Sequence, residues 1–135
     1  MKAVDTSIVV AAFASWHESH AVALRALTSR PLLPVACALE AYAVLTRLPA
    51  PHRVDARLVR DQLASTFGGP GIGLSAEEDG AALVSTLADR GISGGATYDA
   101  VIALVCLRIG ATLLTLDARA RTTYERVGAE IEYIG

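Results

Sequence analysis

The fold is decided by residues 97–117, which read TYDAVIALVCLRIGATLLTLD. The apolar run in the first half predicts a helix over residues 97–109, and Gly110 is typical of the residue at which a helix ends. Residues 111–116 then form an apolar stretch of strand length that stops at Asp117. We therefore predict a helix that leads directly into a buried strand, which is the repeating unit of α/β proteins.

The same order of strand and helix extends toward both ends of the chain. We expect further strands at residues 2–4, 32–35, 72–74 and 130–134, and further helices at residues 8–13, 17–27, 36–48, 54–66, 75–90 and 118–127. This alternation predicts an α/β sandwich with a mostly parallel sheet. Because no linker, repeat or low-complexity segment interrupts it, we expect one domain over residues 1–135.

The composition predicts a folded, soluble chain. Hydrophobic residues make up 53% and charged residues 19%, which excludes an intrinsically disordered protein. The formal net charge is −2, so no strong positive field indicates a nucleic-acid partner. The basic residues are arginines except for Lys2, and arginine is the better phosphate ligand. The longest apolar run, residues 100–107, is far shorter than the roughly 20 residues of a membrane span, and Asp5 interrupts any secretory leader. We expect a cytoplasmic protein without membrane association.

Several classes of active site find no support in the sequence. Cys37 and Cys106 lie in apolar stretches, where we expect them buried and reduced, and no Cys/His spacing indicates zinc. His17, His20 and His52 are expected at the surface. No Ser-His-Asp arrangement or glycine-rich phosphate loop is present. Receiver domains and haloacid-dehalogenase-type phosphatases need a lysine late in the sheet, which this chain lacks.

Four acidic residues occupy conspicuous positions in the predicted pattern. Asp5 follows the first expected strand, and Asp117 follows the strand at residues 111–116. Ligands of open α/β sheets bind beyond the carboxyl ends of the strands. Glu40 and Asp99 stand nearly alone on apolar helices. We therefore expect the four carboxylates to gather at one edge of the sheet.

Each acid also has a structural explanation when it is taken singly. Asp5 and Asp117 suit helix N-caps, a role worth about 0.5–2 kcal/mol. Asp99 in the first turn of a helix complements the helix dipole, which is worth about 0.3–1 kcal/mol. Glu40 has Arg47 as an ion-pair partner within reach along its helix, or lies on an exposed strip. These alternatives stay open for each acid alone.

A bound cation explains the four acids jointly. Burying a carboxylate on an apolar helix is costly unless it meets positive charge, and this pattern occurs at both Glu40 and Asp99. Too few basic residues lie near the acids in sequence to neutralise them all. A donor set of oxygens without His or Cys favours Mg²⁺, or Mn²⁺ in its place, over zinc.

Four short segments also match, in order and spacing, the acidic motifs of a known family. They are Val4-Asp5-Thr6-Ser7, Ala38-Leu39-Glu40-Ala41, Thr97-Tyr98-Asp99-Ala100 and Leu114-Thr115-Leu116-Asp117. Together they resemble the PIN-domain nucleases, and the small size resembles the VapC toxins of type II toxin–antitoxin pairs. The resemblance covers residues 1–135 and implies a three-layer α/β/α sandwich, Mg²⁺-dependent endoribonuclease activity, inhibition by a cognate antitoxin, and homodimers.

Within this resemblance the acids receive distinct roles. Asp5 and Asp99 are expected to hold the principal Mg²⁺. Glu40 is expected to ligate through water or to orient the nucleophile, and Asp117 to complete a second, weaker site. Phosphodiester hydrolysis needs an activated water and positive charge on the phosphate oxygens, and one or two metal ions supply both.

Five polar residues are candidates for supporting these acids or the substrate. Thr6, Ser7 and Thr115 are expected to donate hydrogen bonds to the metal ligands and so to fix their orientation. Arg119 and Arg121 follow the last acid and are candidates for contacts to RNA phosphates. A solvated surface role for these two arginines is an equal alternative.

Two other functions compete with a ribonuclease. One is a PIN-like binding module that engages an antitoxin or another protein without cleaving RNA. The other is a structure-specific DNA nuclease, which usually carries extra acids and insertions for which this chain has no room. The apolar faces of residues 17–27 and 54–63, with Leu24 and Leu58, form either core or a groove for an antitoxin helix, and we favour core.

Overall fold

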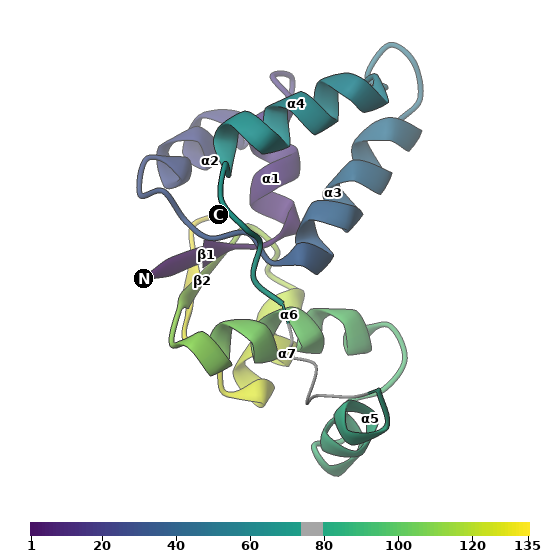
Figure 1. The fold of residues 1–135 in the computed structure, drawn as a ribbon, viewed down its shortest axis with the longest axis vertical. Coiled ribbons are helices and arrows are strands. Elements are labelled where there is room, and N and C mark those ends of the chain that lie inside the picture. Colours follow the sequence, from purple (N-terminus) through teal and green to yellow (C-terminus); the bar gives the residue numbers. More distant parts are fainter. Residues whose placement is uncertain (74–79) are drawn as a thin grey trace.

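The computed structural model describes residues 1–73 and 80–135, and it places a parallel sheet between two layers of helices (Figure 1). The named strands, in spatial order, are β1 (Lys2–Val4), β2 (Thr112–Thr115) and β3 (Ile131–Tyr133). Both pairings are parallel, with Leu113 of β2 opposite Ala3 of β1 and Ile131 of β3. The three-layer α/β/α sandwich expected from the sequence is confirmed.

The sheet continues beyond β1 as single bridges instead of full strands. Leu32 bridges to Ala3, its amide donates to the Lys2 carbonyl at 2.8 Å, and the next bridge joins Pro34 to Ile72. The expected strand at residues 32–35 is therefore wrong in its length. Proline has no amide hydrogen to donate, so Pro34 interrupts the ladder. The last residue of the strand expected at 72–74 lies outside the described residues.

The helices cover the two faces of the sheet unequally. They are α1 (Thr6–Phe13), α2 (His20–Leu27), α3 (Val35–Arg47), α4 (Ala56–Thr66), α5 (Gly80–Asp89), α6 (Ala96–Ile109) and α7 (Ala120–Val127). Helices α1 to α4 lie on one side, and α6 and α7 on the other (Figure 1). Gly110 ends α6 with a φ of 69°, as the sequence predicted.

Most predicted boundaries agree with these helices to within two residues. The second helix is the exception, because residues 14–19 form turns in which the His17 amide donates to the Ala14 carbonyl at 2.9 Å. Helix α2 therefore starts at His20 instead of residue 17. The start of the helix expected at residue 75 lies outside the described residues.

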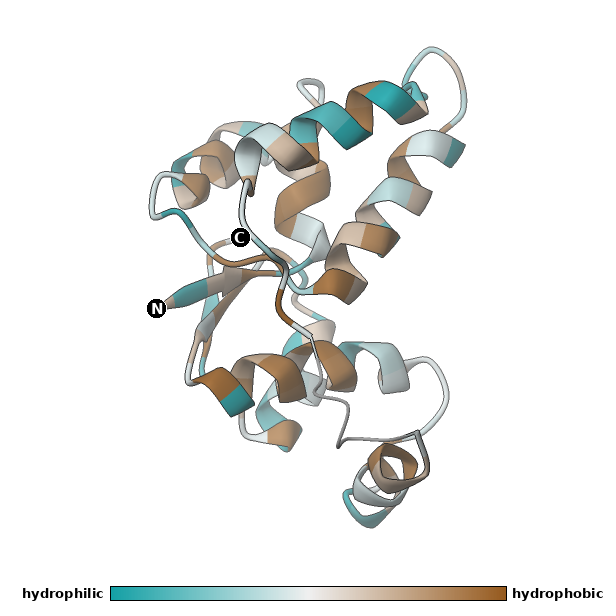
Figure 2. Ribbon diagram, viewed as in Figure 1, coloured by the Kyte–Doolittle hydropathy of each residue, from teal (hydrophilic) through white to brown (hydrophobic). Residues whose placement is uncertain are grey.

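The core lies between the sheet and the two helices nearest to it. Buried residues of β1 and β2, such as Val4 and Leu113, pack with the apolar faces of α1 and α6. Figure 2 shows hydrophobic residues concentrated on α1 and α6, while the outer face of α4 is hydrophilic. Cys37 and Cys106 are free and buried, as expected. Within the described residues, none of the helices combines the length and apolarity needed to span a membrane.

Two apolar positions expected in the core face solvent instead. Leu24 of α2 is 45% exposed and Leu58 of α4 is 52% exposed, whereas their neighbours Ala23 and Val59 are fully buried. The prediction of core packing for these two leucines is wrong. Each of these two helices is rotated so that the adjacent residue meets the core.

Candidate active site

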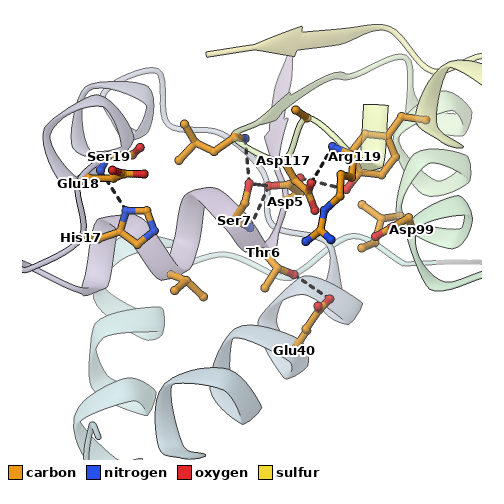
Figure 3. Close-up of a pocket in the computed structure, with 15 residues that line it drawn as sticks. Asp5, Thr6, Ser7, His17, Glu18, Ser19, Glu40, Asp99, Asp117 and Arg119 are labelled. Atoms are coloured by element: carbon orange, nitrogen blue, oxygen red, sulfur yellow. Dashed lines mark hydrogen bonds between the residues drawn. The ribbon is translucent and has the colours of Figure 1, made fainter. Parts of the chain in front are cut away.

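The four acidic residues line one cavity beside the carboxyl ends of β1 and β2 (Figure 3). The cavity has a volume of about 460 Å³. Asp5 follows β1, Asp117 follows β2, Glu40 projects from α3, and Asp99 belongs to the first turn of α6. The four acids therefore line one cavity at the edge of the sheet predicted from the sequence.

Asp5 is the most constrained of the four. Its side chain is only 2% exposed, and its two oxygens accept hydrogen bonds from five donors. Oδ1 accepts from the amide and hydroxyl of Ser7 at 3.0 and 2.5 Å and from the amide of Ile8 at 3.4 Å. Oδ2 accepts from the hydroxyls of Thr115 at 2.5 Å and Tyr124 at 3.0 Å. Asp5 thus caps α1 and also joins α1, β2 and α7.

Burial and hydrogen bonding act on Asp5 in opposite directions. Burial raises the pKa of its carboxyl, because the charged form loses water, and the bonds from Ser7, Thr115, Tyr124 and Ile8 lower it. Burial has the larger effect, so the net shift of the pKa is upward. A nearby cation would offset the cost of the buried charge.

Asp99 differs sharply from Asp5, because its carboxylate accepts no hydrogen bond within the described part of the chain. Burial and the charges of Asp117, Glu40 and Asp5, in that order of effect, raise its pKa from 3.8 to about 6. The charges of the three other carboxylates thus contribute to the shift at Asp99. Asp99 therefore offers both oxygens to a ligand.

The other two acids are each held by local hydrogen bonds. Glu40 accepts a bond from the Thr6 hydroxyl at 3.0 Å, and no ion pair with Arg47 forms among the described residues. Asp117 accepts bonds from the amides of Arg119 at 2.9 Å and Ala120 at 3.3 Å, so it caps the chain entering α7. Asp117 can therefore cap the helix and also bind a metal ion, because its other carboxylate oxygen accepts no hydrogen bond within the described residues.

The donor set fits a hydrated hard cation. In the described part of the chain, no three or more His, Cys, Asp or Glu side chains are close enough to bind one ion together. Mg²⁺ commonly keeps several waters and contacts only one or two carboxylates, so this spacing suits it. The described residues also give none of the four acids a salt bridge, and their charge is left for a cation to neutralise.

The two arginines expected to contact substrate lie in different places. Arg119 lines the cavity with the acids (Figure 3). Arg121 lies over the ring of Tyr133, 5.0 Å from its centroid, with Glu125 3.9 Å away, and it is not among the residues that line the cavity. The geometry therefore favours Arg119 for contact with a ligand in the cavity, and the surface alternative for Arg121. Thr6, Ser7 and Thr115 all donate hydrogen bonds to Glu40 or Asp5, as expected.

Tyr124 and His17 line the cavity, although the sequence did not place them there. Tyr124 is 2% exposed and bonds Asp5, although the helix that carries it is mostly polar. The spacing of Ala120, Tyr124 and Val127 at i, i+4 and i+7 was the available signal, since it marks one inward face. His17 was placed at the surface, but the turns at residues 14–19 bring it to the cavity wall.

Comparison with known proteins agrees with this geometry. The family model described as the PIN domain matches residues 2–126. Ribonuclease VapC40 of Mycobacterium tuberculosis, in strains CDC 1551 / Oshkosh and H37Rv, is 44% identical over 134 residues, which cover 99% of each chain. Ribonuclease VapC27 of strain H37Rv is 36% identical and covers 96% of this chain and 93% of its own. The chain therefore belongs to the PIN domain family.

Proposed function

We propose that this protein is a Mg²⁺-dependent endoribonuclease that hydrolyses RNA phosphodiester bonds as the toxin of a type II toxin–antitoxin pair. Mn²⁺ is expected to substitute for Mg²⁺. The observation that carries the proposal is the cavity at the strand ends, lined by four carboxylates without an ion-pair partner in the described residues. Membership of the PIN domain family and the ribonuclease names of the relatives support it.

The chain's own residues divide the work of cleavage among them. When bound, the ion supplies an acidified water and positive charge for the phosphate oxygens. Asp99 and Asp5 would hold the principal ion, and Asp117 would contribute to a second one. Glu40, held by Thr6, would orient the attacking water, and Arg119, which lines the same cavity, would bind the phosphate.

The decisive test is cleavage of single-stranded RNA by the purified protein. Cleavage should occur in Mg²⁺ or Mn²⁺, stop when a chelator is added, and be lost in Asp5→Asn. The alternative is a binding module, a PIN-like fold that engages a partner protein without cleaving RNA. Intact RNA at high protein and metal concentration would select that alternative.

The proposed partners are a cognate antitoxin protein and a second copy of this chain, and the proposed location is the cytoplasm. Exposed leucines on α2 and α4, Leu24 and Leu58, leave apolar surface for a protein partner. Sedimentation of the purified chain over a range of concentrations should give a dimer. A monomer at all concentrations would remove the homodimer from the proposal but leave the nuclease intact.

Metal binding should weaken in acid, because Asp99 titrates in that range. Its pKa of about 6 means that protons compete with Mg²⁺ below that pH. We expect the Mg²⁺ affinity, measured calorimetrically without RNA, to fall up to about tenfold per pH unit below pH 6. Affinity that stays constant from about pH 8 to about pH 5 would contradict Asp99 as a ligand.

Tyr124 is proposed as a positioning residue for Asp5. Tyr124→Phe keeps the ring but removes the 3.0 Å hydrogen bond, which lowers the pKa of Asp5. We expect Mg²⁺ affinity to fall about 10-fold, the scale of lost support behind a metal ligand, and the loss to grow as pH falls. Tyr42→Phe, at an exposed tyrosine outside the cavity lining, is the matched control. Equal affinities in both variants would remove Tyr124 from the site.

A further inference from the structure

An exposed aromatic stack lies beside the cavity and has no part in the chemistry described so far. Trp16, the sole tryptophan of the chain, lies in the turns between α1 and α2 and is 50% exposed. Its ring packs against the ring of His52, with centroids 4.4 Å apart and planes inclined by 38°. His52 belongs to the turn after α3, so two distant segments build the stack.

The turns that carry Trp16 are held by hydrogen bonds on both sides of it. The His17 amide donates to the Ala14 carbonyl at 2.9 Å, and the His20 amide donates to the His17 carbonyl at 3.0 Å. The ring of His20 bonds the carbonyl of Ala11 on α1 at 2.8 Å. These hydrogen bonds hold the half-exposed ring of Trp16 in a fixed position. The exposure of a large apolar ring to water costs hydrophobic free energy unless a ligand covers the ring.

His17 connects this stack to the acidic cavity. Its ring lies 5.9 Å from that of Trp16 and lines the cavity with Glu18 and Ser19 (Figure 3). The Nδ1 atom accepts a bond from the Ser19 amide at 3.0 Å, so the proton of the neutral ring is on Nε2. His17 therefore presents a hydrogen-bond donor between the stack and the acids.

The charge of the cavity makes a stacking contact valuable to an RNA ligand. Five acids, the four of the site and Glu18, line it with one arginine, Arg119, so the polyanionic backbone gains little attraction there before metal binds. Unpaired bases are uncharged and stack on tryptophan or histidine, and single-stranded RNA is commonly held in this way. Affinity from stacking does not depend on the metal.

We propose that Trp16, backed by His52, is the stacking platform for an unpaired base of the RNA substrate next to the scissile phosphate. His17 donates from Nε2 to the sugar–phosphate backbone that leads from this base into the cavity. The inference rests on the proposed ribonuclease function, whose substrate site it extends. It assigns the ligand class of this surface as single-stranded RNA and excludes a fully paired duplex, whose bases are not free to stack.

The sole tryptophan provides a direct test, because its fluorescence reports on one ring. The wild-type protein in chelator is titrated with a ten-nucleotide single-stranded RNA, with the same sequence as a duplex, and with polyphosphate. We expect the single strand to quench Trp16 saturably, while the duplex and polyphosphate leave its emission unchanged. Equal quenching by polyphosphate would overturn the proposal, since it would mark a purely ionic contact.

Three variants separate stacking from general damage. Trp16→Ala should weaken binding of the single strand, measured by anisotropy of a labelled RNA, about tenfold or more. Trp16→Phe should retain part of the affinity, and His52→Ala should give a smaller loss. Val84→Ala, at an exposed apolar position outside the cavity lining, should bind as wild type.

Cleavage kinetics distinguish a failed platform from a failed ribonuclease. In Mg²⁺ we expect Trp16→Ala to raise KM about tenfold with kcat nearly unchanged, because the ring contacts a base and not the reacting atoms. Wild-type cleavage with an unchanged KM in Trp16→Ala would overturn the platform alone, whereas no cleavage by the wild type would overturn the proposed function. A concentration-dependent change of Trp16 emission without RNA would also overturn the platform, because a second copy would then cover the ring.

Discussion

Replacing Asp99 by asparagine is expected to eliminate RNA cleavage and yet to stabilise the protein without metal. The carboxylate accepts no hydrogen bond from the described residues, so the amide disturbs no protein contact. The substitution removes the negative charge of a proposed metal ligand. We expect kcat to fall by at least about 10²–10³-fold, the scale of one lost electrostatic contact to a transition state. The same substitution removes a charge that Asp117, Glu40 and Asp5 repel.

The sign of the stability change follows from the pKa. The pKa of Asp99 is raised from 3.8 to about 6, so the folded state holds its proton more tightly than the unfolded chain. Wild-type stability is thus lowered as the pH rises through that interval, and the variant avoids the loss. We expect a gain of about 1 kcal/mol above pH 6, after allowance for solvent screening, and none below about pH 4.

Urea unfolding in chelator at several pH values measures this gain directly. Asp61→Asn is the matched control, because Asp61 is an exposed acid that pairs with Arg60 outside the cavity. It should leave both cleavage and the pH dependence of stability as in the wild type. A variant at Asp99 that is clearly less stable than the wild type at neutral pH would contradict the repulsion of Asp99 by the other three acids.

Replacing Asp5 by alanine should also eliminate cleavage but with the opposite effect on stability. The alanine removes the N-cap of α1, worth about 0.5–2 kcal/mol, and leaves the buried hydroxyls of Thr115 and Tyr124 without their acceptor. Each such donor costs about 1–3 kcal/mol unless it finds another partner. The substitution also removes a buried negative charge, which offsets part of this cost. We expect the free energy of unfolding to fall by about 2–4 kcal/mol in total.

Asp55→Ala is the matched control for the Asp5 variant. Asp55 caps α4 by accepting from the Arg57 amide at 2.9 Å, but it is exposed and lies outside the cavity. It should lose only the value of a cap and retain full cleavage. If Asp5→Ala loses no more stability than this control, the five hydrogen bonds at Asp5 do not contribute as the structure implies.

The sequence predicts features that depend on neighbours along the chain. The helix before Gly110, the strand before Asp117 and the position of Asp5 after the first strand follow from local pattern. Their meeting at one edge follows from the parallel order alone. The metal-binding and catalytic roles of the acids stay predictions.

Features that depend on distant contacts did not follow from the sequence. Tyr124 bonds Asp5 across 119 positions, and periodicity marks only that it faces inward. Leu24 was expected in the core, but the periodicity of apolar residues does not determine which of two neighbouring faces of the helix packs inward. The stack of Trp16 on His52 joins two turns. Local residue preferences do not determine the backbone path of these turns.

The parallel sheet also decides where a fusion partner can be attached. Residue 1 precedes β1 at the amino edge of the parallel strands, whereas residue 135 follows β3, which runs in the same direction and ends at the carboxyl edge, beside which the acids lie. The Ile134 amide donates to the carbonyl of Thr115 at 3.0 Å, two residues before Asp117. We therefore expect an affinity tag or fluorescent protein joined at residue 1 to leave the acidic edge free, whereas the same cargo joined at residue 135 starts from that edge.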